Sequence, residues 1–160
     1  MQKIFVSALT ALLLLIVLAS TVFAAPTASG QQLLLKGSVQ DVETQQVAFP
    51  TITVDGMGSG NATQLGLYTM SYHALLNIPT LSATTSATLV AADGSSLFGQ
   101  GTGQGTPTGA PGIVSIVETY TITGGTGRFA GASGSFAVER VLNRATGVST
   151  GTISGTIVLP

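Results

Sequence analysis

The chain has 160 residues with a formal net charge of −1, no cysteine, and charged side chains at only 7% of its positions. The lack of cysteine excludes disulfides and thiolate metal sites. Because Lys and Arg are nowhere clustered, we expect no nucleic acid and no membrane surface as a partner. With so few charges, the surface must consist largely of Thr, Ser, Gly, Gln and Asn, as is common in exported β proteins.

The N-terminal segment has the layout of a secretory signal peptide. Lys3 precedes an apolar run over residues 4–22, and the small residues Ala24 and Ala25 follow it. A retained transmembrane anchor is the alternative, since roughly 20 apolar residues span a bilayer, but no charged stop follows the run. We therefore predict a signal-peptide helix within residues 1–24, cleaved after Ala24. Residues 25–160 would then form one domain that is secreted, periplasmic or held at the cell surface.

The rest of the chain has the pattern of an all-β domain. Short runs rich in Val, Ile, Thr and Tyr alternate with glycine-containing turns, and no helical repeat of apolar positions is present. The predicted strands cover residues 33–42, 51–54, 63–73, 84–91, 96–102, 113–123, 135–142 and 150–159. About eight strands without intervening helices predict an antiparallel meander, closed as a barrel or folded as a sandwich.

Glycine-rich segments mark the predicted breaks between strands. Residues 55–58 are expected to end the second strand, and residues 124–127 to end the sixth. Asp93-Gly94 predicts a hairpin turn because both residues tolerate a positive φ. Residues 103–112, which contain two prolines, are predicted to form a mobile loop.

Two neighbouring strands each carry a charge on their apolar face. Glu118 lies in the apolar phase of residues 113–123, and Arg140 lies in that of residues 135–142. The apolar members of these two faces are Val114, Ile116, Tyr120, Ile122, Phe136, Val138 and Leu142. Because an isolated buried charge is strongly unfavourable, we predict that Glu118 and Arg140 form an ion pair inside the protein. The alternative is that Glu118 faces a ligand cavity as a general acid or polar anchor.

The segment from Gly124 through Gly127, followed by Arg128 and Phe129, resembles a turn of the allene oxide cyclase and dirigent superfamily. Those proteins carry a strand, a Gly-Gly-Ser/Thr-Gly-x-Phe turn and a glycine-containing return strand. The likeness covers residues 60–157 and extends to secreted bacterial members. It implies a calycin-like, eight-stranded antiparallel barrel with an internal apolar cavity, often assembled as a homo-oligomer.

The resemblance implies a cavity for a small apolar ligand, and the alternation selects the side chains that would face it. We expect Glu118, Tyr120, Arg140 and Phe136 to face this cavity. The functional residues of the cyclase and of dirigent proteins have no match that we can place, so no catalytic residue is predicted. No cofactor and no metal ion is expected either.

Other polar residues are interpreted as structural. His73 is the single histidine and is expected at the surface or in packing. Asp41, Glu43 and Asp55 have no spacing of a known calcium loop, so we expect hydrated surface carboxylates. The glycine turn lacks the Lys and the helix start of a phosphate-binding loop.

Three functions remain open at this point. The first is a secreted, non-catalytic barrel that binds a small apolar ligand or has a structural role. The second is a cyclase- or isomerase-type enzyme acting on a hydrophobic substrate through cavity shape and one carboxylate. The third is an interaction module of the extracellular matrix or cell surface. A lined cavity would favour the first two, and a filled barrel the third.

Overall fold

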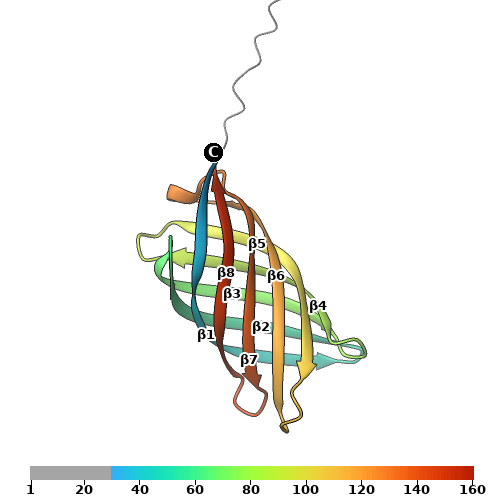
Figure 1. The fold of residues 1–160 in the computed structure, drawn as a ribbon. Coiled ribbons are helices and arrows are strands. Elements are labelled where there is room, and N and C mark those ends of the chain that lie inside the picture. The colour runs from blue at the N-terminus through green and yellow to red at the C-terminus, as the bar shows by residue number, and fades with distance from the viewer. Residues whose placement is uncertain (1–29) are drawn as a thin grey trace, which may run out of the picture.

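The computed structural model describes residues 30–160, which form eight antiparallel strands closed into a barrel (Figure 1). The strands are β1 (Gln31–Ala48), β2 (Thr51–Ala62), β3 (Gly66–Asn77), β4 (Ser82–Ala91), β5 (Ser96–Pro107), β6 (Ile113–Gly125), β7 (Ser133–Asn143) and β8 (Val148–Leu159). Each strand pairs with the next in the chain, and β8 pairs with β1 to close the sheet. The predicted signal peptide lies outside the described residues.

The structure confirms the all-β meander with eight strands and selects the barrel over the sandwich. The Asp93-Gly94 turn is confirmed, with Gly94 at a φ of +83° between β4 and β5. Two predicted breaks are wrong. Residues 55–58 lie inside β2, and residues 103–107 continue β5 as far as Pro107. The connection between β5 and β6 is therefore much shorter than the predicted loop.

These glycines belong to strands because they leave room for large side chains of the neighbouring strand. In the sheet register Gly56 lies opposite Tyr72, Gly103 opposite Glu118, and Gly151 opposite Arg140. A Cβ atom built on Gly56 would lie 2.1 Å from the Tyr72 ring. A small residue facing a large one is how the interior of a small barrel is filled. Alternating glycines at inward positions are therefore packing sites here, and not chain breaks.

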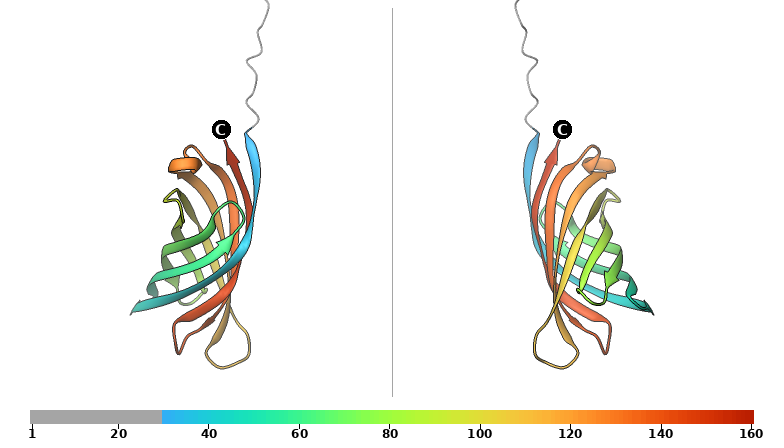
Figure 2. Two further views of the ribbon diagram at one scale, coloured as in Figure 1. Left: turned by 90° about the vertical axis from the view of Figure 1, so that its left-hand side faces the viewer. Right: turned by 90° about the vertical axis from the view of Figure 1, so that its right-hand side faces the viewer.

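One end of the barrel is closed by its own connections. A short 3-10 helix, η1 (Gly127–Phe129), follows the glycine turn and lies at the same end as the C-terminus (Figure 2). Its Phe129 is 1% exposed and joins Leu65 and Leu97 in the core. Arg128 pairs with Asp93 of the β4–β5 hairpin and donates to the backbone oxygen of Gln64 in the β2–β3 turn. The Arg128 side chain thereby ties three connections together over the closed end.

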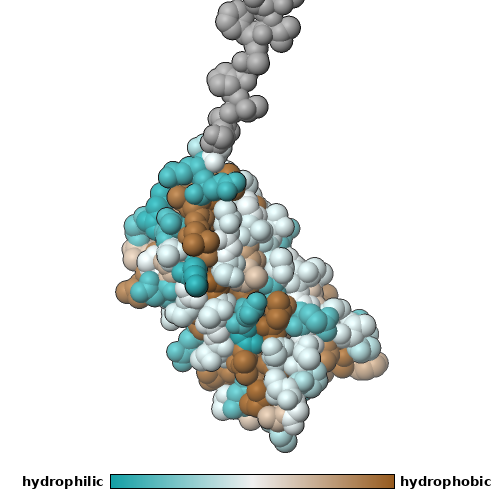
Figure 3. All heavy atoms as spheres, viewed as in Figure 1, coloured by the Kyte–Doolittle hydropathy of each residue, from teal (hydrophilic) through white to brown (hydrophobic). Residues whose placement is uncertain are grey.

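The opposite end carries the connections after β1, β3, β5 and β7 and is less completely filled. On the outside, most strand positions carry Thr, Ser or Gln, interrupted by apolar side chains in several places (Figure 3). Val42 and Met57, for example, are both exposed and lie opposite each other on β1 and β2. Within residues 30–160, no helix has the length and apolar character needed to cross a membrane.

Candidate ligand-binding site

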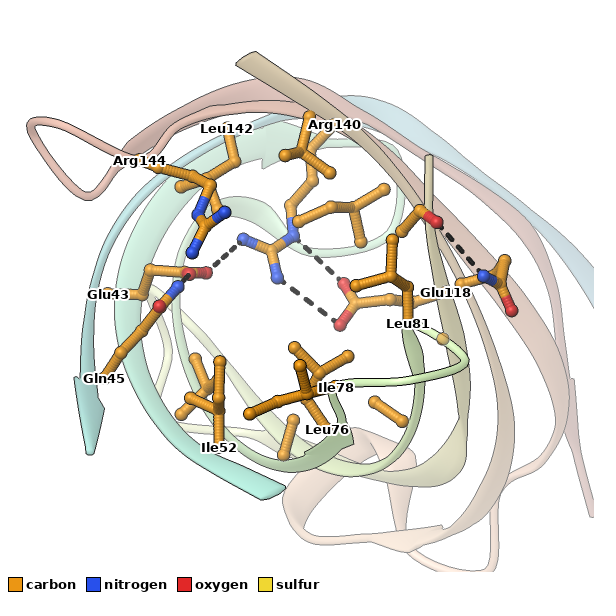
Figure 4. Close-up of a pocket in the computed structure, with 18 of the residues that line it drawn as sticks. Glu43, Gln45, Ile52, Leu76, Ile78, Leu81, Glu118, Arg140, Leu142 and Arg144 are labelled. Carbon is orange, nitrogen blue, oxygen red and sulfur yellow. Dashed lines mark hydrogen bonds and ion pairs between the residues drawn. The ribbon is translucent and has the colours of Figure 1, made fainter. Parts of the chain in front are cut away.

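A cavity of about 180 Å³ lies inside the barrel at the less filled end (Figure 4). Its wall is mainly apolar and comes from strands β1 through β7 and from the β3–β4 connection. The apolar lining side chains are Ile52, Val54, Ala74, Leu76, Ile78, Leu81, Ala83, Val114, Ile116 and Leu142. Glu43, Glu118 and Arg140 supply its buried polar lining, and Gln45, Gln104 and Arg144 add exposed polar side chains. The result is a small apolar chamber with one charged wall.

Arg140 on β7 is the centre of that charged wall. Its Nε atom donates to Oε2 of Glu118 at 3.1 Å, and its Nη2 atom reaches Oε1 of the same carboxylate at 3.4 Å. The other end of the guanidinium points to β1, where Nη1 lies 2.9 Å from Oε2 of Glu43 and 3.1 Å from Oδ1 of Asp41. The Arg140 side chain is only 3% exposed, so these contacts form inside the protein. One guanidinium thus bridges carboxylates from two sides of the barrel.

Neutral hydrogen-bonding groups complete the cluster. The Tyr72 hydroxyl lies 2.8 Å from Asp41 and 2.9 Å from Glu43, and its single proton can be donated to only one of them at a time. The Ser149 hydroxyl donates to Oδ2 of Asp41 at 2.6 Å, and the Gln45 amide donates to Oε1 of Glu43 at 2.6 Å. In the described part of the chain, every buried side-chain nitrogen and oxygen has a partner. Such complete pairing is what allows polar groups to remain in a core.

The electrostatic state of two members follows from their surroundings. Burial by itself lowers the pKa of Arg140, but the neighbouring carboxylates, above all that of Glu118, outweigh burial and raise the pKa above its ordinary value. Arg140 is therefore charged near neutral pH. Burial raises the pKa of Tyr72 far above its ordinary value, and Asp41 and Glu43 add to that rise while Arg140 opposes it. Tyr72 is therefore a neutral donor in the cluster.

The predicted ion pair between Glu118 and Arg140 is confirmed. The expectation for Asp41 and Glu43 is wrong, because they are only 1% and 7% exposed and both contact Arg140. Their positions continue the inward phase of β1, which also contains Val39. That alternation was visible in the sequence, but charged residues are so rarely buried that the pattern alone favoured a surface position. Tyr72 follows the inward alternation of Tyr68 and Met70, but that pattern gives no sign of a polar cluster, and Ser149 lies just before the predicted strand over residues 150–159.

Tyr120 and Phe136, also expected to face a cavity, pack against each other in the filled part of the barrel. Their rings are stacked with centroids 4.7 Å apart, and the Tyr120 hydroxyl lies 3.0 Å from that of Thr85. Neither residue lines the cavity, because both lie farther than Glu118 and Arg140 along their strands from the cavity end. His73 is at the outer surface, as predicted, with Nδ1 2.8 Å from Oδ1 of Asp55.

Comparison with solved structures connects this barrel to a known fold. The chain superimposes on the pterocarpan synthase dirigent protein GePTS1 with a TM-score of 0.57, over 84% of this chain and 94% of that one. The chain has a dirigent-like fold. Sequence identity is 15%, so the likeness concerns the fold alone. It confirms the dirigent-like barrel that the glycine turn predicted. No protein-family model matches the sequence, and no curated protein matches it either.

Proposed function

We propose that this protein is a secreted barrel that binds a small, largely apolar molecule in the cavity, with a polar group of the ligand against the charged wall. The observation that supports this proposal is an apolar chamber that ends on Glu43, Glu118 and Arg140. Ligand sites are typically apolar cavities with a few convergent polar groups that fix orientation. A volume of about 180 Å³ fits a ligand smaller than a typical drug, or the inner part of a longer one whose remainder leaves through the mouth.

A purely structural barrel explains this arrangement less well. Replacing a buried ion cluster by apolar residues of similar volume is often neutral or stabilising, so an ion cluster is weak support for stability. The closed half of the barrel shows the structural solution, because Leu97, Phe129 and Phe136 fill it without charges. Charges are instead concentrated beside the cavity. This distribution favours ligand binding over a matrix or surface module.

Catalysis on a hydrophobic substrate is the second candidate. Two carboxylates, Glu43 and Glu118, line the same apolar chamber, and a carboxyl group next to an apolar substrate can act in proton transfer. The structural neighbour GePTS1 is itself named a synthase. A cyclase or isomerase reaction would need a substrate that reaches Glu118 or Glu43. Loss of turnover in Glu118→Gln, with ligand affinity retained, would favour this candidate.

The binding proposal is tested with the protein purified from its own host. Native mass spectrometry should find a small molecule on the barrel and also gives the number of subunits. Ala83→Phe fills the cavity from its wall, whereas Ala137→Phe adds the same bulk on β7 outside the cavity lining. We expect the first variant to lose the bound molecule and the second to retain it. Equal occupancy in the two variants would overturn the assignment of the cavity as the site.

Secretion is tested independently of binding. N-terminal sequencing of protein recovered from the medium or periplasm should begin at Ala25. A product that retains Met1 and sediments with membranes would contradict cleavage and favour the anchor.

A further inference from the structure

We propose that the ligand of this cavity is an organic cation, with an ammonium or amidinium group facing the carboxylates and an apolar body along the cavity wall. The inference rests on the proposed function, because it assigns a ligand class to the same cavity. Two observations support it: the carboxylates around the cavity outnumber the buried cations, and Arg140 alone forms ion pairs with all three of them.

The buried cluster holds more negative than positive groups. Asp41, Glu43 and Glu118 are three carboxylates, and Arg140 is the one cation with which they form ion pairs. Among the described residues that line the cavity, Arg144 is the only other cation, but it is exposed at the mouth and solvent screens its charge. Tyr72 is a neutral donor and adds no positive charge. The net formal charge of the cluster is therefore negative, which favours the binding of a further cation.

Two of the three carboxylates, those of Glu43 and Glu118, face the cavity. Asp41 does not line the cavity, and its carboxylate accepts hydrogen bonds from Ser149, Tyr72 and Nη1 of Arg140. Glu118 does line it: Nε of Arg140 donates to its Oε2 at 3.1 Å, while the contact from Nη2 of Arg140 to its Oε1 is as long as 3.4 Å. A carboxylate oxygen can accept more than one hydrogen bond, so the two oxygens of Glu118 retain acceptor capacity. In Figure 4 the carboxylates of Glu43 and Glu118 lie on either side of Arg140, beside the chamber.

The wall restricts the kind of cation. Within residues 30–160, no group of three or more His, Asp or Glu side chains is arranged to hold a metal ion. A bare or hydrated metal ion would also leave the apolar wall from Leu76, Ile78 and Leu81 without contacts. An organic cation satisfies both parts of the chamber, since its charged group meets carboxylates while its hydrocarbon part is removed from water.

The test compares three probes of nearly the same size on the full mature protein. Benzylamine, benzyl alcohol and benzoate differ mainly in charge and are titrated separately by calorimetry near neutral pH. We expect benzylamine to bind at least about tenfold more tightly than benzyl alcohol, which corresponds to one charge-assisted hydrogen bond. Benzoate should bind most weakly, because it brings a fourth negative charge to the site.

Variants then identify the carboxylate. Glu118→Gln should weaken benzylamine binding by about tenfold and benzyl alcohol binding by clearly less, because only the amine brings a positive charge to the carboxylate. Glu139→Gln removes the same charge at an exposed position of β7 and should change neither affinity. The comparison of the three probes on the unmodified protein needs no variant, so it remains decisive even if Glu118→Gln fails to fold.

The outcomes separate this inference from the proposed function. If benzyl alcohol binds as tightly as benzylamine and Ala83→Phe abolishes both, the cavity is a ligand site but its ligand is not cationic. Tighter binding of benzoate would overturn the inference in the same way. If none of the three probes binds, the cationic inference fails. If the protein from its host also carries no molecule in the cavity, the proposed function fails as well.

Discussion

Replacing Arg140 by methionine should be among the most damaging single changes in this protein. Methionine preserves much of the volume but removes the shared cation, which leaves Asp41, Glu43 and Glu118 buried without their ion-pair partner. Breaking one buried ion pair typically costs about 3–5 kcal/mol. Because three carboxylates lose their partner together, we expect a loss of at least about 5 kcal/mol in the free energy of unfolding. Single domains have only about 5–15 kcal/mol in total, so much of the variant should be unfolded.

Glu118→Gln should be much milder, although it alters the same ion pair. Arg140 keeps Asp41 and Glu43 as partners, and the glutamine amide oxygen can still accept from Nε. We expect a loss of about 1–2 kcal/mol, the effect of weakening one hydrogen bond to a charged group. The difference between the two variants arises because Arg140 has three carboxylate partners. If Glu118 and Arg140 formed an isolated ion pair, Arg140→Met and Glu118→Gln should lose similar amounts of stability.

The assay is urea unfolding followed by circular dichroism, with linear extrapolation to water. Lys36→Met is the matched control, because it makes the same change from cation to methionine at an exposed position of β1 and should stay within about 0.5 kcal/mol of the parent. In the Arg140→Met background, adding Glu118→Gln should restore part of the stability, so that the double loss is smaller than the sum. Equal losses for the two single variants, or a larger loss for Glu118→Gln, would refute the shared-cation reasoning.

Three further predictions concern other parts of the barrel. All three tyrosines are buried, and burial raises the pKa of each, that of Tyr68 to about 12, with Asp41 adding to the effect. This effect stabilises the folded protein fully at pH values below the ordinary tyrosine pKa of 10.0, and the stabilisation is lost as the pH rises above that value. Near-ultraviolet absorbance should therefore show no tyrosinate at pH 10 until denaturant is added. A tyrosinate band in the folded protein at pH 10 would contradict this burial. Hydrogen bonding from the Ser95 backbone, with a contribution from Arg128, lowers the pKa of Asp93, so its stabilising effect should be present near neutral pH and lost on acidification. The melting temperature of Asp93→Asn should therefore lie below that of the parent near neutral pH and converge with it in acid, whereas a constant gap would argue against the ionised carboxylate as the cause. Phe136→Ala should lower the free energy of unfolding in urea by about 3–5 kcal/mol, because it leaves a cavity at a fully buried position. Phe98→Ala, at a partly exposed position, should lower it by about 1 kcal/mol or less. Similar losses for the two variants would contradict this difference in packing.

The local periodicity of the chain was sufficient to predict part of the site. Period-two alternation placed Glu118 and Arg140 on the inner faces of β6 and β7, and the two strands are neighbours in both sequence and space. Adjacent antiparallel strands need no knowledge of the rest of the fold to bring such residues together. The Glu118–Arg140 pair could therefore be predicted, whereas the contact between Arg140 and Asp41, which are 99 positions apart, could not.

What the sequence determined by itself was the class of fold, the number of strands and the inward phase of most of them, because these depend on local alternation and turn residues. Tertiary structure decided two things. Closure of β8 onto β1 brought Asp41 and Glu43 to Arg140, and a charged residue becomes stable in a core only where such a partner is already in place. The register of the strands decided whether a glycine ends a strand or faces a large side chain, as Gly56 faces Tyr72 and Gly103 faces Glu118. The sequence around a glycine does not tell which residue lies opposite it in the sheet. Only the folded barrel therefore shows that Gly56 and Gly103 make room for Tyr72 and Glu118 of the charged cluster.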